Sequence, residues 1–114
     1  MTATTRRTYP PITCRPWCID GDGHADEHPE DQRCASGWET VPLALNRKWS
    51  DSGGALHTTE IEVRSEAGEE PAGCPPHVVI YEVSEDIEWR LYPDEVRRLA
   101  ALLVEAADRL EAAR

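Results

Sequence analysis

The sequence contains no long apolar run. Its 114 residues are 39% hydrophobic, but no stretch approaches the roughly 20 apolar residues that a membrane-spanning helix requires. The N-terminal region also lacks the apolar segment of a secretory signal, because residues 9–12 read Tyr-Pro-Pro-Ile. We therefore expect no membrane association and a cytoplasmic location.

Positive charge is scarce. The chain has 12 basic and 22 acidic residues, which gives a formal net charge of −10. Because phosphate contacts dominate affinity for nucleic acid, this balance argues against a general nucleic-acid binder. We expect a protein partner instead, and a homodimer with a second copy of the chain is one candidate.

Apolar residues are also sparse in the first third of the chain. A chain of this length forms one small domain with a thin core, so a bound metal ion would add to its folding stability. The core-poor stretch 13–37 holds three of the four cysteines and two of the four histidines. The expected organisation is a flexible N-terminus at 1–12 and a single domain over 13–114, divided into a metal-binding loop at 13–37, a β-sheet at 38–92 and a helix at 93–112.

Five candidate metal ligands fall within 21 residues: Cys14, Cys18, His24, His28 and Cys34. Thiolate and imidazole are the ligands that zinc prefers, and four of them complete a tetrahedron. Such a site contributes roughly 10–16 kcal/mol in small peptides, enough to fold a segment that has no core. The first predicted set is Cys14, Cys18, His24 and Cys34, with His28 as the alternate for His24 or Cys34.

The fourth cysteine, Cys74, lies far along the chain between a glycine and a proline. It is a further candidate ligand. In a secreted chain the four cysteines would be read as disulfides, whereas inside the cell they are better read as metal ligands or free thiols.

Alternation of apolar and polar residues begins at Trp38 and predicts a four-stranded antiparallel sheet. The last two strands are expected to pair as a hairpin. The acidic segment after residue 65, including Glu66 and Glu70, is predicted to be a solvated loop. The expected strands cover 41–45, 59–64, 77–83 and 87–92.

A helix is predicted at the C-terminus. Pro93 suits the first helical position, and Asp94 and Glu95 complement the helix dipole. Apolar residues recur at steps of three and four, which gives one apolar stripe. We expect this helix to pack on one face of the sheet and to bury Leu99, Leu103 and Leu110, so the predicted fold class is α+β.

Both ends of the chain together resemble a family of small actinobacterial proteins of unknown function. The N-terminal motif is Cys14-Arg-Pro-Trp-Cys18 followed by His24, and the C-terminal motif begins Pro93-Asp-Glu-Val-Arg-Arg-Leu-Ala. Similar chains often carry a second His where this one offers Cys34, and Ala where it has Val96. The resemblance implies a shape and a bound metal, and it implies no activity.

Three functions are compatible with these patterns. The first is a non-enzymatic interaction or regulatory module stabilised by a structural Zn²⁺. The second is a zinc-dependent hydrolase, because His24-Ala-Asp-Glu27-His28 matches the inverted zinc-peptidase pattern; the glycines before it and Pro29 after it disfavour the helix that this chemistry needs. The third is a zinc-thiolate redox sensor in which Cys14 and Cys18 are oxidised to a disulfide.

Overall fold

The computed structural model describes residues 8–46 and 48–112. The predicted flexible N-terminus covers residues 1–12, and residues 1–7 of it lie outside the described part of the chain. Residues 8–12 are tied to the following loop, since the Tyr9 N–H donates to the Ala25 carbonyl at 2.8 Å and the Ile12 N–H donates to the Gly23 carbonyl at 3.0 Å. Within the described residues, the segment 8–12 is therefore hydrogen-bonded to the loop at residues 23–25.

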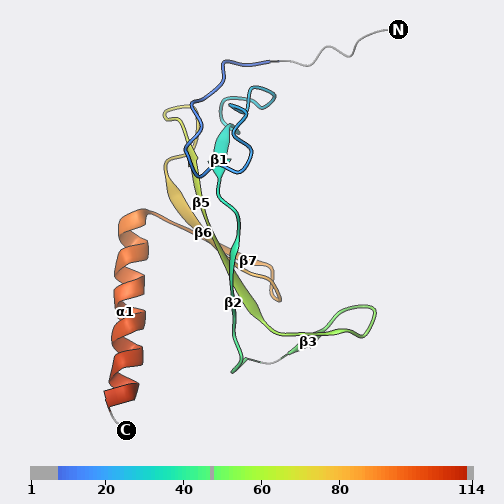
Figure 1. Cartoon of the computed structure of the whole chain (residues 1–114), viewed down its shortest axis with the longest axis vertical. Helices are drawn as coiled ribbons and strands as arrows, with labels where there is room; N and C mark the ends of the chain where they lie inside the picture. Colours follow the sequence, from blue (N-terminus) through green and yellow to red (C-terminus); the bar gives the residue numbers. More distant parts are fainter. Residues whose placement is uncertain (1–7, 47, 113–114) are drawn as a thin grey trace.

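The fold is α+β, with antiparallel strands and one C-terminal helix (Figure 1). A five-stranded sheet has the order β1-β5-β6-β7, with β2 also paired to β5, and β3 and β4 form a separate two-stranded hairpin. The strands are β1 Arg33–Ala35, β2 Glu39–Pro42, β3 Trp49–Ser50, β4 Leu56–His57, β5 Glu60–Gly68, β6 His77–Glu82 and β7 Ile87–Leu91, and the helix is α1 Pro93–Ala112.

The prediction of four strands is wrong because β1 lies inside the segment assigned to the metal-binding loop. Its central residue Cys34 pairs with Ala67 of β5, so β5 also runs three residues into the predicted solvated loop. Three residues are too few to show a periodic pattern. Strand β1 exists because β5 offers it an edge, and this pairing is not visible in the local sequence.

Strands β1 and β2 lie end to end along the same edge of β5. Between them the chain makes an irregular step at Ser36, whose N–H donates to the Ser65 carbonyl and whose hydroxyl accepts the Ser65 N–H, both at 2.9 Å. This step keeps the two short strands in one sheet. The expected β6–β7 hairpin is confirmed, with Val78 opposite Leu91 and Ile80 opposite Trp89.

The pairing register divides the sheet into a polar and an apolar face. On the polar face, Arg64, Val79 and Arg90 lie side by side, and Glu66 lies opposite His77. The other face, here called the apolar sheet face, is mostly apolar, although Glu39, Ser65 and Glu82 also lie on it. Its apolar residues are Val41, Ile61, Val63, Val78, Ile80, Ile87, Trp89 and Leu91. None of these eight side chains is buried. Among the described residues, the buried apolar ones are Cys34, Ala67 and Val79.

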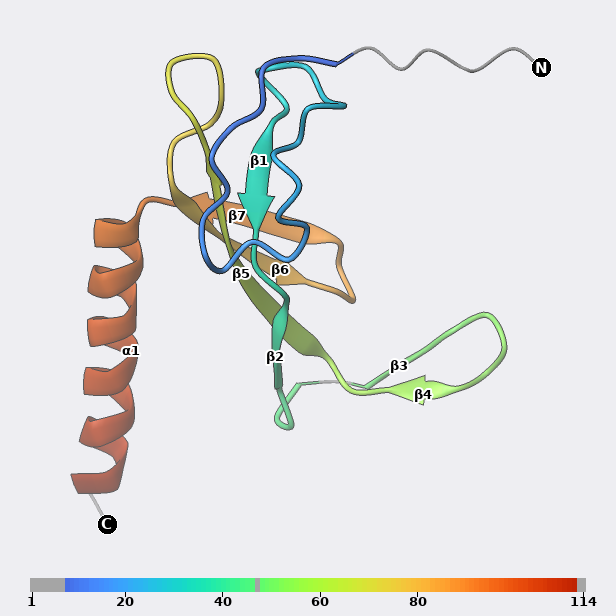
Figure 2. The same ribbon diagram turned by 45° about the horizontal axis from the view of Figure 1, so that its top comes forward.

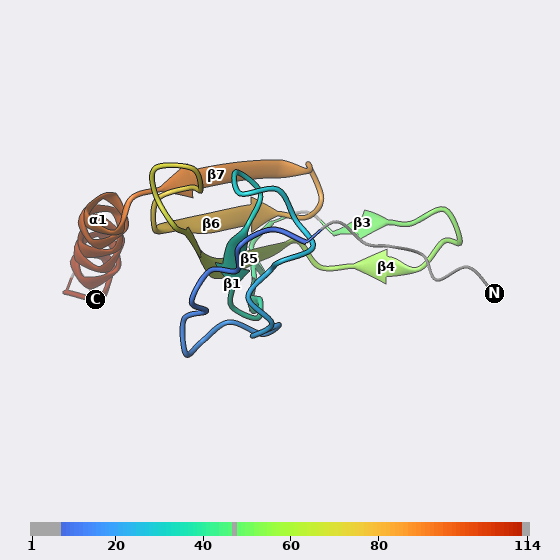
Figure 3. The same ribbon diagram turned by 90° about the horizontal axis from the view of Figure 1, so that it is seen from above.

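Helix α1 forms where it was predicted, but it does not cover the sheet. Leu99, Leu103 and Leu110, which were expected to be buried, are 39, 62 and 75% exposed, and no residue of α1 is buried. Figures 2 and 3 show the helix beside the ends of β6 and β7 and away from the face of the sheet. No helix in the described part of the chain is long and apolar enough to cross a membrane.

Candidate metal centre

The structure brings together Cys14, Cys18, His24 and Cys34, the four residues of the first predicted set. One ligand atom from each lies within 4.8 Å of all the others. At zinc bond lengths of about 2.0–2.3 Å, tetrahedral ligands stand roughly 3.5–4 Å apart. Small movements would therefore bring all four atoms onto one ion. Cys34 and His24 are buried, and Cys14 and Cys18 are half-buried.

Two glycines shape the loop between the second cysteine and the histidine. Gly21 and Gly23 have φ angles of 63° and 80°, in the left-handed region that favours glycine. Gly23 also has no room for a side chain, because a Cβ there would lie 2.8 Å from Cβ of Pro11. The close contact with residues 11 and 12 folds the N-terminal segment back over the centre.

Both ring nitrogens and the backbone carbonyl of His24 have polar neighbours. Its Nε2 lies 3.5 Å from Sγ of Cys18, while Nδ1 lies 3.6 Å from Asp22 and 3.8 Å from Glu27. Its carbonyl accepts a 3.0 Å hydrogen bond from the buried amide of Gln32. A carboxylate on the nitrogen opposite the ligand atom is the usual support of a metal-binding histidine.

Backbone amides also point at the sulfur atoms. The N–H of Arg15 donates to Sγ of Cys34 at 3.3 Å, and the N–H of Gly23 donates to Sγ of Cys14 at 3.2 Å. Amide hydrogen bonds favour the thiolate over the neutral thiol. They help to offset the charge of several thiolates held in one place.

Two thiols of the centre, those of Cys18 and Cys34, have strongly perturbed pKa values. Burial would raise the pKa of Cys18, but hydrogen bonds from the Gly21 backbone, His24 and Cys34 outweigh it and lower this pKa to about 6. For Cys34, burial raises the pKa to about 12, and the neighbouring Cys18 and Cys14 add to the effect against the Arg15 amide. Thiolates held close together repel one another, and a divalent cation between them would remove this electrostatic penalty.

The donor set suits zinc. Three thiols and one imidazole form a Cys₃His group, one of the common sets of structural zinc sites, and four protein ligands leave no open position. The residues that would hold the ion are Sγ of the three cysteines and Nε2 of His24. Such an ion would join the N-terminal segment to strand β1 through Cys34.

The alternate ligands lie outside this group. His28 is exposed and packs against Tyr9, with ring centroids 4.8 Å apart and Nε2 3.4 Å from the phenol oxygen. Cys74 is not part of the group; its carbonyl instead accepts the N–H of Gly68 at 2.9 Å. Residues 24–27 form a turn and not a helix, so the two histidines of the peptidase-like pattern do not converge.

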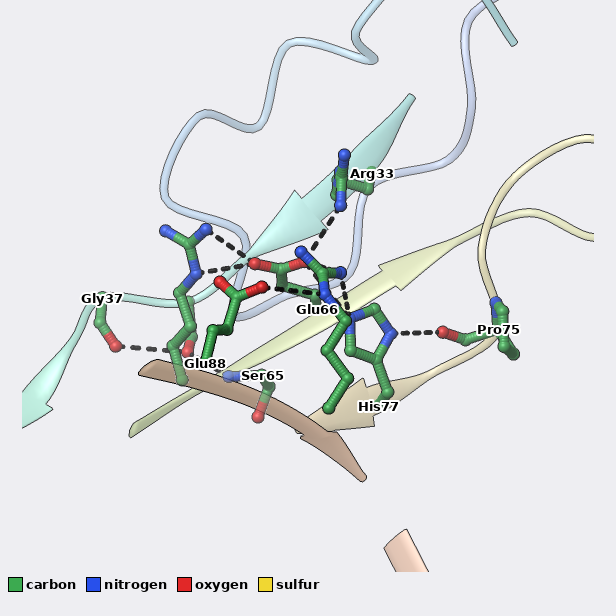
Figure 4. Close-up of polar contacts among 10 residues, drawn as sticks. Arg33, Gly37, Ser65, Glu66, Pro75, His77 and Glu88 are labelled. Carbon is green, nitrogen blue, oxygen red and sulfur yellow. Dashed lines mark hydrogen bonds and ion pairs between the residues drawn. The ribbon is translucent and has the colours of Figure 1, made fainter. Parts of the chain in front are cut away.

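A second polar cluster surrounds Glu66, which was expected to be solvated and is only 1% exposed. Its carboxylate pairs with arginines from three strands, Arg33 at 3.2 Å, Arg64 at 2.6 Å and Arg90 at 3.4 Å. His77 lies 3.2 Å away, and Figure 4 shows its ring between Glu66 and Pro75. This Glu66 cluster links β1, β5, β6 and β7 on the polar face.

Sequence patterns gave no signal for the Glu66 cluster, because its members come from four strands. Burial would raise the pKa of Glu66, but the hydrogen bond from Arg64 and the charges of Arg64, Arg33 and Arg90 outweigh it, so this pKa lies below its ordinary value. The guanidinium of Arg64 also lies 4.3 Å from the ring centroid of Trp38. We interpret the cluster as support for β1, the strand that carries Cys34.

Comparison with known proteins gives one assignment. No curated protein and no solved structure matches the chain. A family described as Domain of unknown function (DUF6907) matches residues 1–114, which agrees with the resemblance to a family of unknown function. Because the match spans the whole sequence, this chain belongs to the DUF6907 family.

Proposed function

We propose that this chain is a non-enzymatic interaction module whose N-terminal segment is folded by one structural Zn²⁺. The observation that carries the proposal is the enclosed group of Cys14, Cys18, His24 and Cys34 within 4.8 Å. Because apolar burial around these residues is small, a metal is the strongest available source of stability for the segment. Free thiols of this kind suit a reducing compartment, so we also propose a cytoplasmic location.

Metal analysis of the purified protein tests the proposal. We expect one zinc per chain in the native protein and loss of that zinc in Cys14→Ser and Cys34→Ser variants. Cys74→Ser is the matched control, since it removes a thiol outside the group, and it should retain full zinc. Protein that is folded over residues 13–37 and contains no metal would overturn the proposal.

A zinc hydrolase is the second function considered, and the geometry disfavours it. Four protein ligands leave no position for a reactive water. Glu27, the candidate general base, lies 3.8 Å from Nδ1 of His24, which is the nitrogen opposite the ligand atom. If the chain were a hydrolase, native protein would cleave members of a peptide and ester panel and Glu27→Gln would not. If neither protein cleaves any member of the panel, the result supports the non-enzymatic proposal.

A redox role for the same site remains the third hypothesis. Two zinc-bound thiolates, two protons and one molecule of hydrogen peroxide would give a Cys14–Cys18 disulfide, two molecules of water and free Zn²⁺. Zinc release by mild peroxide, reversed by a thiol reductant and zinc, would support a sensor. Retention of the metal under oxidant would leave the purely structural role.

A further inference from the structure

Two apolar surfaces are not fully covered within the part of the chain that the structure describes. The first is the apolar sheet face, whose Trp89 is 51% exposed. The second is the helix stripe, which we define as Val96, Leu99, Leu103, Ala106 and Leu110 of α1. Its spacing of 3, 4, 3 and 4 residues places all five side chains on one side of the helix. Each surface is of the kind that normally covers the other in an α+β domain.

The start of α1 is closely tied to the end of β7. A single residue, Tyr92, separates β7 from α1. The Tyr92 N–H donates to the Glu95 carboxylate at 2.7 Å, and the Tyr92 carbonyl accepts the N–H of Val96 at 3.0 Å. Pro93 then fixes the first helical φ angle. These contacts fix where the helix begins, and the helix leaves the sheet at its edge (Figure 1).

The exposed surface of the chain is large enough to include an interface with a second protein chain. The radius of gyration is 19.0 Å, against about 13 Å for a compact chain of this length. The accessible surface is 8820 Å², roughly 2,500 Å² more than a compact monomer of this mass has. Even if half of this excess belongs to chain ends and loops, about 1,200 Å² per chain matches the interface of a stable dimer.

A helix in a protein gains most of its stability from the packing of its apolar face, and no residue of the 20-residue helix α1 is buried. We propose that a second copy of this chain covers both surfaces: α1 of each chain lies on the apolar sheet face of the other around a two-fold axis. The arrangement is self-complementary, because every chain supplies one stripe and one face. The inference names a partner for the interaction module proposed above and rests on that function only for its biological role.

The mass of the native protein in solution is the first test. Sedimentation or light scattering should give twice the chain mass of 12.8 kDa. Leu99→Asp and Leu103→Asp place a charge in the proposed interface and should weaken dimerisation more than about 100-fold. Val104→Asp is the matched control, since Val104 lies on the same helix away from the stripe, and it should leave the dimer intact.

Metal content separates this inference from the proposed function. A monomeric Leu103→Asp variant that keeps one zinc per chain supports the dimer and leaves the metal centre unaffected. A native dimer that contains no zinc would contradict the metal proposal and not this one. A native protein that is monomeric at all concentrations up to those of an NMR sample overturns the inference.

Contacts between chains give the decisive readout, and they do not depend on any variant folding. In a mixture of isotope-labelled and unlabelled native protein, filtered NOE spectra should connect the Leu99 and Leu103 methyl groups to Ile80 and Trp89 of the other chain. If these contacts occur only within one chain, the helix folds back and the inference is wrong. Cross-chain contacts restricted to the two α1 helices would also overturn it.

Discussion

Nε2 of His24 lies 3.5 Å from Sγ of Cys18, although His24 has a φ angle of 54° in the left-handed region that a histidine seldom adopts. The strain is maintained by the hydrogen bonds that its backbone makes to Asp22 and Gln32. Strain of this kind persists where surrounding contacts fix a conformation, and it commonly marks functional sites. Here the result is an imidazole directed at three thiols.

Substitutions of His24 and His28 should therefore differ in their effect on metal binding. His24→Ala removes a ligand and should lower zinc affinity by more than about 100-fold, because loss of a mere supporting partner already costs 10–100-fold. His28→Ala, the control, removes an exposed ring that packs on Tyr9 and should leave affinity unchanged. Competition with a chromophoric zinc chelator measures both. Equal losses in the two variants would contradict the ligand assignment.

Removal of the metal should unfold one part of the chain before the rest. The proposed zinc would join the N-terminal segment to β1 through Cys34, whereas β5, β6 and β7 are held by continuous backbone pairing. A strong chelator should abolish hydrogen-exchange protection in residues 14–35 and preserve most protection in β6. Zinc should restore the original pattern. Uniform loss of protection across the chain would show that the whole sheet depends on the metal.

Alanine substitutions at three glycines should destabilise the protein to graded extents. Gly37 has neither a positive φ angle nor a neighbour within 4 Å of an added Cβ, so Gly37→Ala should be close to neutral. Gly21 has a positive φ angle and open space, so its substitution should cost about 1 kcal/mol. Gly23 combines a positive φ angle with the clash against Pro11, and it should cost about 2–3 kcal/mol.

Chemical denaturation with zinc present measures this series as changes in the free energy of unfolding. The order Gly37, Gly21, Gly23 matters more than the absolute values. If Gly23→Ala is as stable as Gly21→Ala, the close approach of residues 11 and 12 to the loop does not contribute.

Features that depend on nearby residues were predictable from the sequence. Cys14, Cys18 and His24 fall within 11 residues, and their ligand types identify the centre without a structure. The helix starts at Pro93 as its first-turn residues indicate, and the β6–β7 hairpin follows from two periodic segments and a short turn. Each of these signals lies within one local window.

Features that depend on distant residues were not predictable. Strand β1 requires the edge of β5, and burial of Glu66 requires arginines from three strands. The acidic segment after residue 65 was predicted to be a solvated loop because the arginines that balance its charge lie elsewhere in the sequence. The stripe of α1 was read correctly as apolar, but periodicity cannot tell which surface covers it. The error about its packing leads to the proposal of a second chain.

Glu66 should make the stability of the sheet sensitive to acid. Because its folded pKa lies below the ordinary value of 4.5, the ionised carboxylate stabilises the fold above about pH 4.5, and this contribution is lost as the pH falls through the folded pKa. The groups that face it are Arg33, Arg64, His77 and Arg90, with Glu88 bound to Arg90 at 3.1 Å.

Glu66→Gln should lower the free energy of unfolding by about 2–3 kcal/mol near neutral pH. This is less than for a fully buried ion pair, because the arginine side chains are partly exposed. The difference from the native protein should shrink as the pH falls through the folded pKa of Glu66.

Acid also releases zinc, but it does so in both proteins, so the difference between their free energies of unfolding isolates the effect of the carboxylate. Glu85→Gln, at an exposed position, should show no difference at any pH. A constant gap between native protein and Glu66→Gln down to the acid transition would mean that the arginines do not stabilise the Glu66 charge.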